Sequence, residues 1–119
     1  MQPTITYKRG DVVLVGFMFA DESGWKQRPA VVVSCSAYQT GRQEVIVSAV
    51  TSNVKCLLFG DHLLVAWKEA GLLFPSVVTG ILRTVKVTMI HRKLGSLTKS
   101  DMGAVDTELG KVLERRRKS

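Results

Sequence analysis

The sequence predicts a mainly β protein, a small barrel accompanied by one short helix and a C-terminal helix. Three apolar segments rich in β-branched residues follow one another before residue 51 and are separated by short polar connections, which is typical of an antiparallel meander. Helical spacing of apolar residues begins only after residue 98. Because so many strands exceed what one flat sheet of this size accommodates, and because open edges need cover, we expect a barrel.

In the first half we expect a strand at residues 11–19, a loop at 21–28, a strand at 30–34, a turn at 37–42 and a strand at 44–50. The strands are rich in valine and aromatic side chains. The loop is polar and contains Gly24. Pro29 opens the second strand, because proline is tolerated at the first residue of a strand.

In the second half we expect a strand at residues 62–65, a short helix at 66–70, strands at 77–79 and 82–89, and a terminal helix. Gly71 ends the short helix. Thr98 and Asp101 resemble a capping box, with aspartate in the place of glutamate. One face of the terminal helix carries Met102, Val105, Leu109, Val112 and Leu113. We find no repeat or linker and expect one domain over residues 1–119.

Charge and composition narrow the class of function. The chain has 17 basic and 10 acidic residues and a formal net charge of +7, so its field attracts polyanions. The basic residues 115–118 also suit a helix end, where cations complement the dipole. The longest apolar run, residues 12–20, is too short to span a bilayer, and no secretion signal opens the chain. Cys35 and Cys56 have no metal or redox spacing, so we expect buried thiols in a reducing cytoplasm.

Several segments, in this order, resemble the MazF/PemK toxin family. The most characteristic is Lys26-Gln-Arg-Pro-Ala-Val-Val-Val-Ser34. The others are Lys8-Arg-Gly-Asp-Val-Val13, Val45-Ile-Val-Ser-Ala-Val-Thr-Ser-Asn53, Trp67-Lys-Glu-Ala-Gly-Leu72, Pro75-Ser-Val-Val78, Leu82-Arg-Thr-Val85 and Leu94-Gly-Ser-Leu97. Together they cover nearly the whole chain.

The resemblance implies an SH3-like barrel of the CcdB/PemK type that forms a homodimer in the cytoplasm. It implies a toxin of a type II toxin–antitoxin pair that cleaves single-stranded RNA, often mRNA, with no metal or other cofactor. In such a reaction the 2′-hydroxyl attacks the adjacent phosphorus and leaves a 2′,3′-cyclic phosphate and a 5′-hydroxyl. A cognate antitoxin protein blocks the RNA groove.

Arg28 and Thr51 are the candidate catalytic residues. The planar guanidinium of Arg28 can donate two parallel hydrogen bonds to phosphate oxygens and keeps its charge, which suits a negatively charged phosphorane. Thr51 lies where the third strand meets a polar turn, and the matching threonine belongs to the family's active site. Without the family match, Arg28 is a surface arginine and Thr51 a strand-end threonine.

Further residues are candidates for binding the substrate. Ser52 and Asn53 can add hydrogen-bond donors beside Thr51, although such residues also simply form turns. Lys26 and Gln27 precede Arg28, and Lys26 suits a phosphate contact. Trp25 can stack on an unpaired base, or can pack against the antitoxin or the dimer partner.

The general base stays open. Many family members carry an acidic or polar residue where this chain has Thr79-Gly80-Ile81, and Thr79 is expected to take part of that space. Asp21 or Glu22 is an alternative base, or the reaction relies on positioning and on Arg28 and Thr51. A histidine pair is a further route, but neither histidine lies in the motif segments.

Two other classes of function compete with RNA cleavage. A CcdB-type toxin has the same fold and acts by binding DNA gyrase without cutting. A catalytically silent RNA-binding module is the third possibility. Arg28 and Thr51, within their motifs, favour the nuclease.

Overall fold

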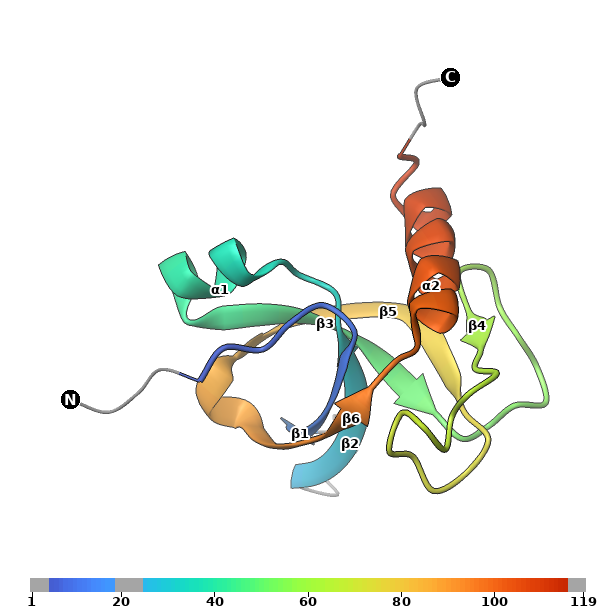
Figure 1. The fold of residues 1–119 in the computed structure, drawn as a ribbon, viewed down its shortest axis with the longest axis horizontal. Coiled ribbons are helices and arrows are strands. Elements are labelled where there is room, and N and C mark those ends of the chain that lie inside the picture. Colours follow the sequence, from blue (N-terminus) through green and yellow to red (C-terminus); the bar gives the residue numbers. More distant parts are fainter. Residues whose placement is uncertain (1–4, 19–24, 116–119) are drawn as a thin grey trace.

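The computed structural model describes residues 5–18 and 25–115, and one curved sheet organises them (Figure 1). The elements in order are β1 (Asp11–Met18), β2 (Trp25–Val32), α1 (Ser36–Arg42), β3 (Glu44–Thr51), β4 (His62–Leu63), β5 (Val77–Lys86), the 3₁₀ helix η1 (Val87–Met89), β6 (Ile90–Ser96) and α2 (Lys99–Val112). The six strands form an antiparallel sheet in the order β4-β5-β3-β2-β1-β6. The predicted mainly β class with two helices is confirmed.

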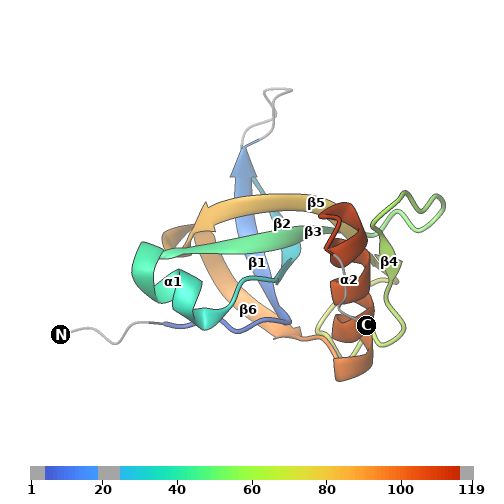
Figure 2. The same ribbon diagram turned by 90° about the horizontal axis from the view of Figure 1, so that it is seen from above.

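The sheet curls without closing into a continuous ladder, because β4 and β6 remain its two edges. The helices lie near opposite ends of the long strands β3 and β5, as Figure 2 shows from above. Side chains alternate across β1, so Val12 faces one apolar cluster while Val13 and Val15 face the other. This alternation gives the curled sheet two separate cores.

The first core fills the inside of the curl and joins β1, β2, β3, β5 and β6. Its buried members are Tyr7, Val13, Val15, Ala30, Val32, Val45, Val47, Val85 and Ile90. The second core lies between the other face of the sheet, the segment after β4, and α2. Its buried members are Val12, Val31, Val50, Leu64, Ala70, Leu72, Val78, Val105 and Leu109. The predicted apolar face of the terminal helix therefore packs on the sheet through Val105 and Leu109.

The strand β2 begins earlier than expected. Residues 25–28, predicted to lie in a loop, belong to the strand, and Pro29 lies inside it opposite Leu14 of β1. Pairing of β2 with β3 covers only Ala30 to Val32, so Pro29 has no neighbour in β3 that requires a backbone N–H donor. The proline is tolerated for that reason, and Arg28 is held by a strand.

Residues 36–42 form the helix α1, where the sequence predicted a turn. The buried side chain of Gln39 explains the difference, because its Oε1 accepts from Tyr7 N at 2.8 Å and its Nε2 donates to Ile5 O at 2.6 Å. Both polar ends of a buried amide are thereby satisfied, and the helix is fixed to the N-terminal segment. This tertiary contact stabilises a short helix whose own sequence favours a turn.

Three further predictions are corrected. Residues 66–70 form a turn, closed by Ala70 N to Ala66 O at 3.2 Å and Gly71 N to Lys68 O at 3.0 Å, and do not form a helix. The two strands expected at 77–79 and 82–89 are replaced by one strand, β5, and the 3₁₀ helix η1. The strand β6 that follows was not predicted, because residues 91–93 are charged or polar. Cys35 and Cys56, expected to be buried, are both exposed.

The segment after β4 lies against the edge strand β6 at two glycines. A Cβ on Gly71, in the segment between β4 and β5, would lie 2.1 Å from Leu94 O of β6. A Cβ on Gly95 of β6 would lie 2.4 Å from Ala70 O. Gly71 also has φ +86°, in the left-handed region that favours glycine. The segment after β4 can therefore lie directly on the backbone of β6 only because both residues lack a side chain.

We expect Gly71→Ala to lower the free energy of unfolding by more than about 3 kcal/mol, because it combines a strained φ with an overlap against backbone. Gly103→Ala is the matched control, since Gly103 lies in α2 and its added Cβ meets nothing within 4 Å. That variant should gain about 0.5–1 kcal/mol from helix propensity. Urea denaturation of both variants measures the difference, and equal midpoints would contradict the close approach.

Candidate functional site

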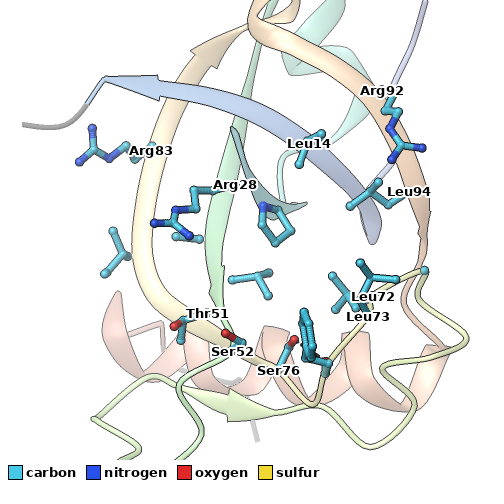
Figure 3. Close-up of a pocket in the computed structure, with 16 residues that line it drawn as sticks. Leu14, Arg28, Thr51, Ser52, Leu72, Leu73, Ser76, Arg83, Arg92 and Leu94 are labelled. Carbon is cyan, nitrogen blue, oxygen red and sulfur yellow. Dashed lines mark hydrogen bonds between the residues drawn. The ribbon is translucent and has the colours of Figure 1, made fainter. Parts of the chain in front are cut away.

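A pocket of about 1050 Å³ opens beside the ends of β2 and β3. One side of it is formed by strands of the sheet and another by the segment of residues 71–76 (Figure 3). Its lining residues are Leu14, Arg28, Pro29, Ala49, Val50, Thr51, Ser52, Gly71, Leu72, Leu73, Phe74, Ser76, Ile81, Arg83, Arg92 and Leu94. Both candidate catalytic residues belong to this lining.

The order of the sheet explains why Arg28 and Thr51 line one pocket. The strands β2 and β3 are neighbours, and their ladder runs from Ala30 opposite Ala49 to Val32 opposite Val47. Arg28 precedes this ladder in β2 and Thr51 follows it in β3, so the two residues lie at the same end of neighbouring antiparallel strands. Both belong to the pocket lining.

The hydroxyl of Thr51 is oriented by the turn that follows it. Asn53 N donates to Thr51 Oγ1 at 3.1 Å, and Lys55 N donates to Asn53 Oδ1 at 3.3 Å. Because the oxygen of Thr51 already accepts one hydrogen bond, its proton can be donated toward the pocket. Ser52 also lines the pocket, whereas Asn53 is exposed outside it and supports the turn.

Two arginines of the pocket were not predicted as site residues. Arg83 lies on β5 opposite Val47, and Arg92 lies on β6 opposite Leu14. Figure 3 shows Arg28 and Arg83 toward the side of Thr51, and Arg92 across the pocket beside Leu94. Arg83 belongs to a segment that resembles the family, and that resemblance was the available signal. Arg92 had none, because β6 itself was not predicted.

The charged side chains in the described lining of the pocket are all basic. Within the described part of the chain, its lining contains Arg28, Arg83 and Arg92 and no aspartate, glutamate or histidine. Guanidinium groups match the planar oxygens of phosphate, and the hydroxyls of Thr51 and Ser52 add neutral donors. The pocket can therefore bind an anionic group and stabilise additional negative charge on it.

The remaining predicted residues lie elsewhere. Lys26 and Gln27 are exposed on β2, outside the pocket lining. Thr79 is buried, and its Oγ1 donates to Ala49 O at 2.7 Å and accepts from Ile81 N at 3.2 Å, so it supports the junction of β3 and β5 and does not face the pocket. Trp25 begins β2, but its side chain lies outside the described residues, as do Asp21 and Glu22.

The histidines are not part of the pocket. His91 is exposed on β6, and His62 Nε2 lies 2.8 Å from Oδ1 of the buried Asp101. The Asp101 carboxylate also accepts from Val65 N at 3.1 Å and from Ala66 N at 3.0 Å. Thr98 Oγ1 accepts from Asp101 N at 3.2 Å, so the predicted cap is present in one direction only. The side chain of Asp101 fastens α2 to the segment after β4.

Within the described ranges, no group of three or more histidine, cysteine or acidic side chains is arranged to hold a metal ion. Neither α1 nor α2 has the length and apolar character needed to cross a membrane.

The fold and the pocket define a small protein with a curled, barrel-like antiparallel sheet and a pocket whose described charged side chains are all arginines. Residues 8–113 match the family described as PemK-like, MazF-like toxin of type II toxin-antitoxin system. This match covers most of the sequence, and the protein belongs to that family. A sequence search of curated proteins finds no significant match.

Solved structures agree with the fold. A MazE–MazF complex from Deinococcus radiodurans superposes with a TM-score of 0.78 at 22% identity, covering 95% of this chain and 100% of that chain. An endoribonuclease in complex with its cognate antitoxin from a mycobacterial species gives 0.74 at 18% identity, with 94% and 99% covered. The Mycobacterium tuberculosis toxin MazF-mt6 gives 0.73 at 21% identity, with 90% and 99% covered. These similarities confirm the predicted barrel type.

We expect the stability of the fold to depend on the ionised form of Asp101. Burial alone raises the pKa of this carboxyl, but the hydrogen bonds from His62, Ala66 and Val65 and the charge of His62 outweigh burial and lower the pKa below its ordinary value. A lowered folded-state pKa contributes stability above the unfolded-state value of about 3.9, and this stability is lost as pH falls through the folded-state pKa.

Asp101→Asn should therefore lower the free energy of unfolding at pH 7 by about 2 kcal/mol and reduce the loss of stability below about pH 4. Asp106→Asn is the control: it removes only an exposed ion pair between α2 and Arg9, which should cost less than about 1 kcal/mol. Urea unfolding between pH 3 and pH 7 measures both effects. Parallel pH profiles for Asp101→Asn and the original protein would contradict this role of Asp101.

Proposed function

We propose that this protein is a metal-independent endoribonuclease toxin that cleaves single-stranded RNA. The observation that carries the proposal is the grouping of Arg28, Arg83 and Thr51 in one pocket whose described lining has no acidic side chain. Membership of a toxin family supports it, and so do neighbours of the same fold that are described as endoribonucleases. RNA supplies the anionic group that such a pocket selects.

The proposed reaction is attack of a 2′-hydroxyl on the adjacent phosphorus. A bond forms between O2′ and phosphorus, the bond from phosphorus to O5′ breaks, and the products carry a 2′,3′-cyclic phosphate and a 5′-hydroxyl. Arg28 and Arg83 donate to the non-bridging oxygens, where negative charge grows in the phosphorane. Thr51 donates its hydroxyl proton as a hydrogen bond to the same phosphate and holds it in place.

The described lining offers no carboxylate or imidazole for proton transfer, so we assign both transfers to water in the open pocket. Water takes the proton of the 2′-hydroxyl and returns one to the 5′-oxygen, which leaves the proton balance unchanged. The arginines then act by stabilising charge, an effect that is often the largest single contribution to catalysis.

Binding partners form the last part of this proposal. We propose that the protein acts in the cytoplasm as a homodimer and that a cognate antitoxin inhibits it. The fold neighbours include complexes described as containing MazE or a cognate antitoxin. Exposed apolar side chains such as Val65 and Leu113 provide surface for protein contacts.

The purified protein should cleave a long single-stranded RNA in the presence of EDTA and leave 2′,3′-cyclic phosphate ends. End-group analysis of the fragments measures this, and sequencing of their 5′ ends gives the cut site. RNA whose nucleotide at the cut carries 2′-deoxyribose should stay intact, because the attacking group is missing. Intact RNA in every case, with growth arrest relieved by gyrase mutants, would favour the CcdB-type alternative.

Arg28→Ala should lower kcat/KM by about 100-fold or more, and Thr51→Val by about tenfold, because each removes a donor to the phosphate. Lys86→Ala and Thr84→Val are matched controls, exposed on β5 and outside the pocket lining. Both site variants should also lose toxicity while keeping the thermal unfolding midpoint of the original protein. A toxic and fully active Arg28→Ala variant would disprove the assignment.

The pH dependence separates this mechanism from a histidine pair. With water as the proton acceptor and donor, kcat/KM should stay nearly constant between about pH 6 and pH 9, because no side chain that takes part in proton transfer titrates in this range. Two titrating imidazoles would instead give a bell-shaped profile near neutrality. Initial rates on one short RNA across this range provide the test, and a bell-shaped profile lost in His62→Gln or His91→Gln would contradict the proposal.

A further inference from the structure

The pocket is longer than a single phosphate requires. Leu14 of β1 lies opposite Pro29 of β2 on one side and opposite Arg92 of β6 on the other. Pro29, Leu14 and Arg92 therefore form one row across three neighbouring strands, and all of them line the pocket.

The width of this row separates Arg92 from Arg28, which precedes Pro29 on β2. Neighbouring strands lie about 4.8 Å apart, so two spacings put the backbone of β6 about 10 Å from that of β2. Arg92 lies across the pocket from Arg28 and Thr51 (Figure 3). Arg92 must therefore face a different part of an extended ligand.

Apolar side chains occupy the space between the two cationic ends. Leu14 and Pro29 form the sheet side, and Leu72, Leu73 and Phe74 come from the segment after Gly71. Leu73 is 82% exposed and Phe74 is 62% exposed, so neither contributes much to the core. Large apolar side chains that stay exposed inside a pocket indicate a surface for a ligand.

The segment that carries Phe74 is held in place by its backbone. Ser76 Oγ donates to Phe74 O at 2.7 Å, and Leu64 N donates to Ser76 O at 3.0 Å. Leu72 N donates to Trp67 O at 3.1 Å, and Gly71 lies against β6. The backbone that carries Phe74 is thus held by hydrogen bonds, which lowers the cost of presenting this side chain to a ligand.

We propose that this apolar stretch is a base-binding subsite: an unpaired base beside the cleaved phosphate stacks on Phe74, and Arg92 binds the phosphate on the far side of that base. The inference rests on the proposed ribonuclease function. A single RNA strand alternates anionic phosphates with flat apolar bases, which matches the alternation of arginine, apolar wall and arginine. Because the described lining lacks acidic residues, a polyanion fits it better than a peptide segment of mixed charge.

The experiment uses a short RNA that contains one mapped cut site. An abasic nucleotide is placed in turn on each side of the cut, and kcat/KM is measured for the original protein, Phe74→Ala and Phe59→Ala. Phe59 is the matched control, since it is 74% exposed and lies outside the pocket lining. On intact RNA, Phe74→Ala should lose about tenfold or more, and Phe59→Ala should lose nothing.

The decisive result is the coupling between protein and RNA changes. At one position, the original protein should cut the abasic RNA about tenfold more slowly than the intact RNA. The Phe74→Ala variant should cut these two RNAs at the same rate. Phe74→Trp should restore cleavage because it keeps a flat face, whereas Phe74→Leu should not. Equal sensitivity of Phe74→Ala and the original protein at every position would overturn the stacking assignment.

Arg92 is tested by salt dependence. For binding to the same RNA with 2′-deoxyribose at the cut, Arg92→Gln should reduce the slope of log Kd against log salt by about 0.7, the value for one phosphate contact on a single strand. Lys86→Gln, which removes an equal charge outside the pocket, should leave the slope unchanged. An unchanged slope in Arg92→Gln would overturn the phosphate contact.

The outcomes distinguish this inference from the proposed function. If the original protein cuts no RNA, the ribonuclease function itself fails. If it cuts RNA and Phe74→Ala behaves as Phe59→Ala does, only the subsite is wrong. If Phe74→Ala cuts at the original rate but escapes inhibition by the cognate antitoxin, the apolar wall serves a protein partner and the base-binding proposal is overturned.

Discussion

The backbone contact between Gly71 and Gly95 is the constraint on which the rest of the structure depends. The sheet has two open edges, β4 and β6, and no ladder joins them. The segment after β4 can lie on β6 only because both glycines lack a Cβ, which at either position would overlap a carbonyl group. Leu64, Ala70 and Leu72 are then buried in the second core. A curled sheet is completed in this way by a loop, and the loop becomes one wall of the pocket.

The pocket combines rigid and adaptable parts in a way that suits a polymeric anion. Arg28 and Thr51 lie at the same end of the neighbouring strands β2 and β3, and Asn53 orients the threonine hydroxyl from the following turn. Phe74 comes from a connection between strands, where side chains can differ among proteins of one fold without disturbing the core. Under the proposed function, phosphate chemistry on strands and base contacts on a loop would let one fold cut RNA at different sequences.

Sequence reasoning identified residues of the pocket better than the elements that carry them. Arg28 and Thr51 were predicted because their segments resemble a family, and both line one pocket. Arg92 was missed because no strand was predicted at residues 90–96, and this strand is defined by its pairing with β1. Thr79 was assigned to the site from its position in the chain, whereas its hydroxyl bonds to Ala49 and Ile81. Contacts between distant segments decide such cases.

The sequence by itself determined the mainly β class, the terminal helix with Thr98 at its start, and the family, because periodicity, capping and ordered motifs are local properties. Only the tertiary structure decided that residues 36–42 are helical, that Asp101 binds His62 instead of completing its own cap, and that Arg83 and Arg92 join the pocket. Each of these depends on burial or register set by residues far away in the chain. The predicted barrel nuclease thus gained a pocket with two cationic ends and an apolar wall between them.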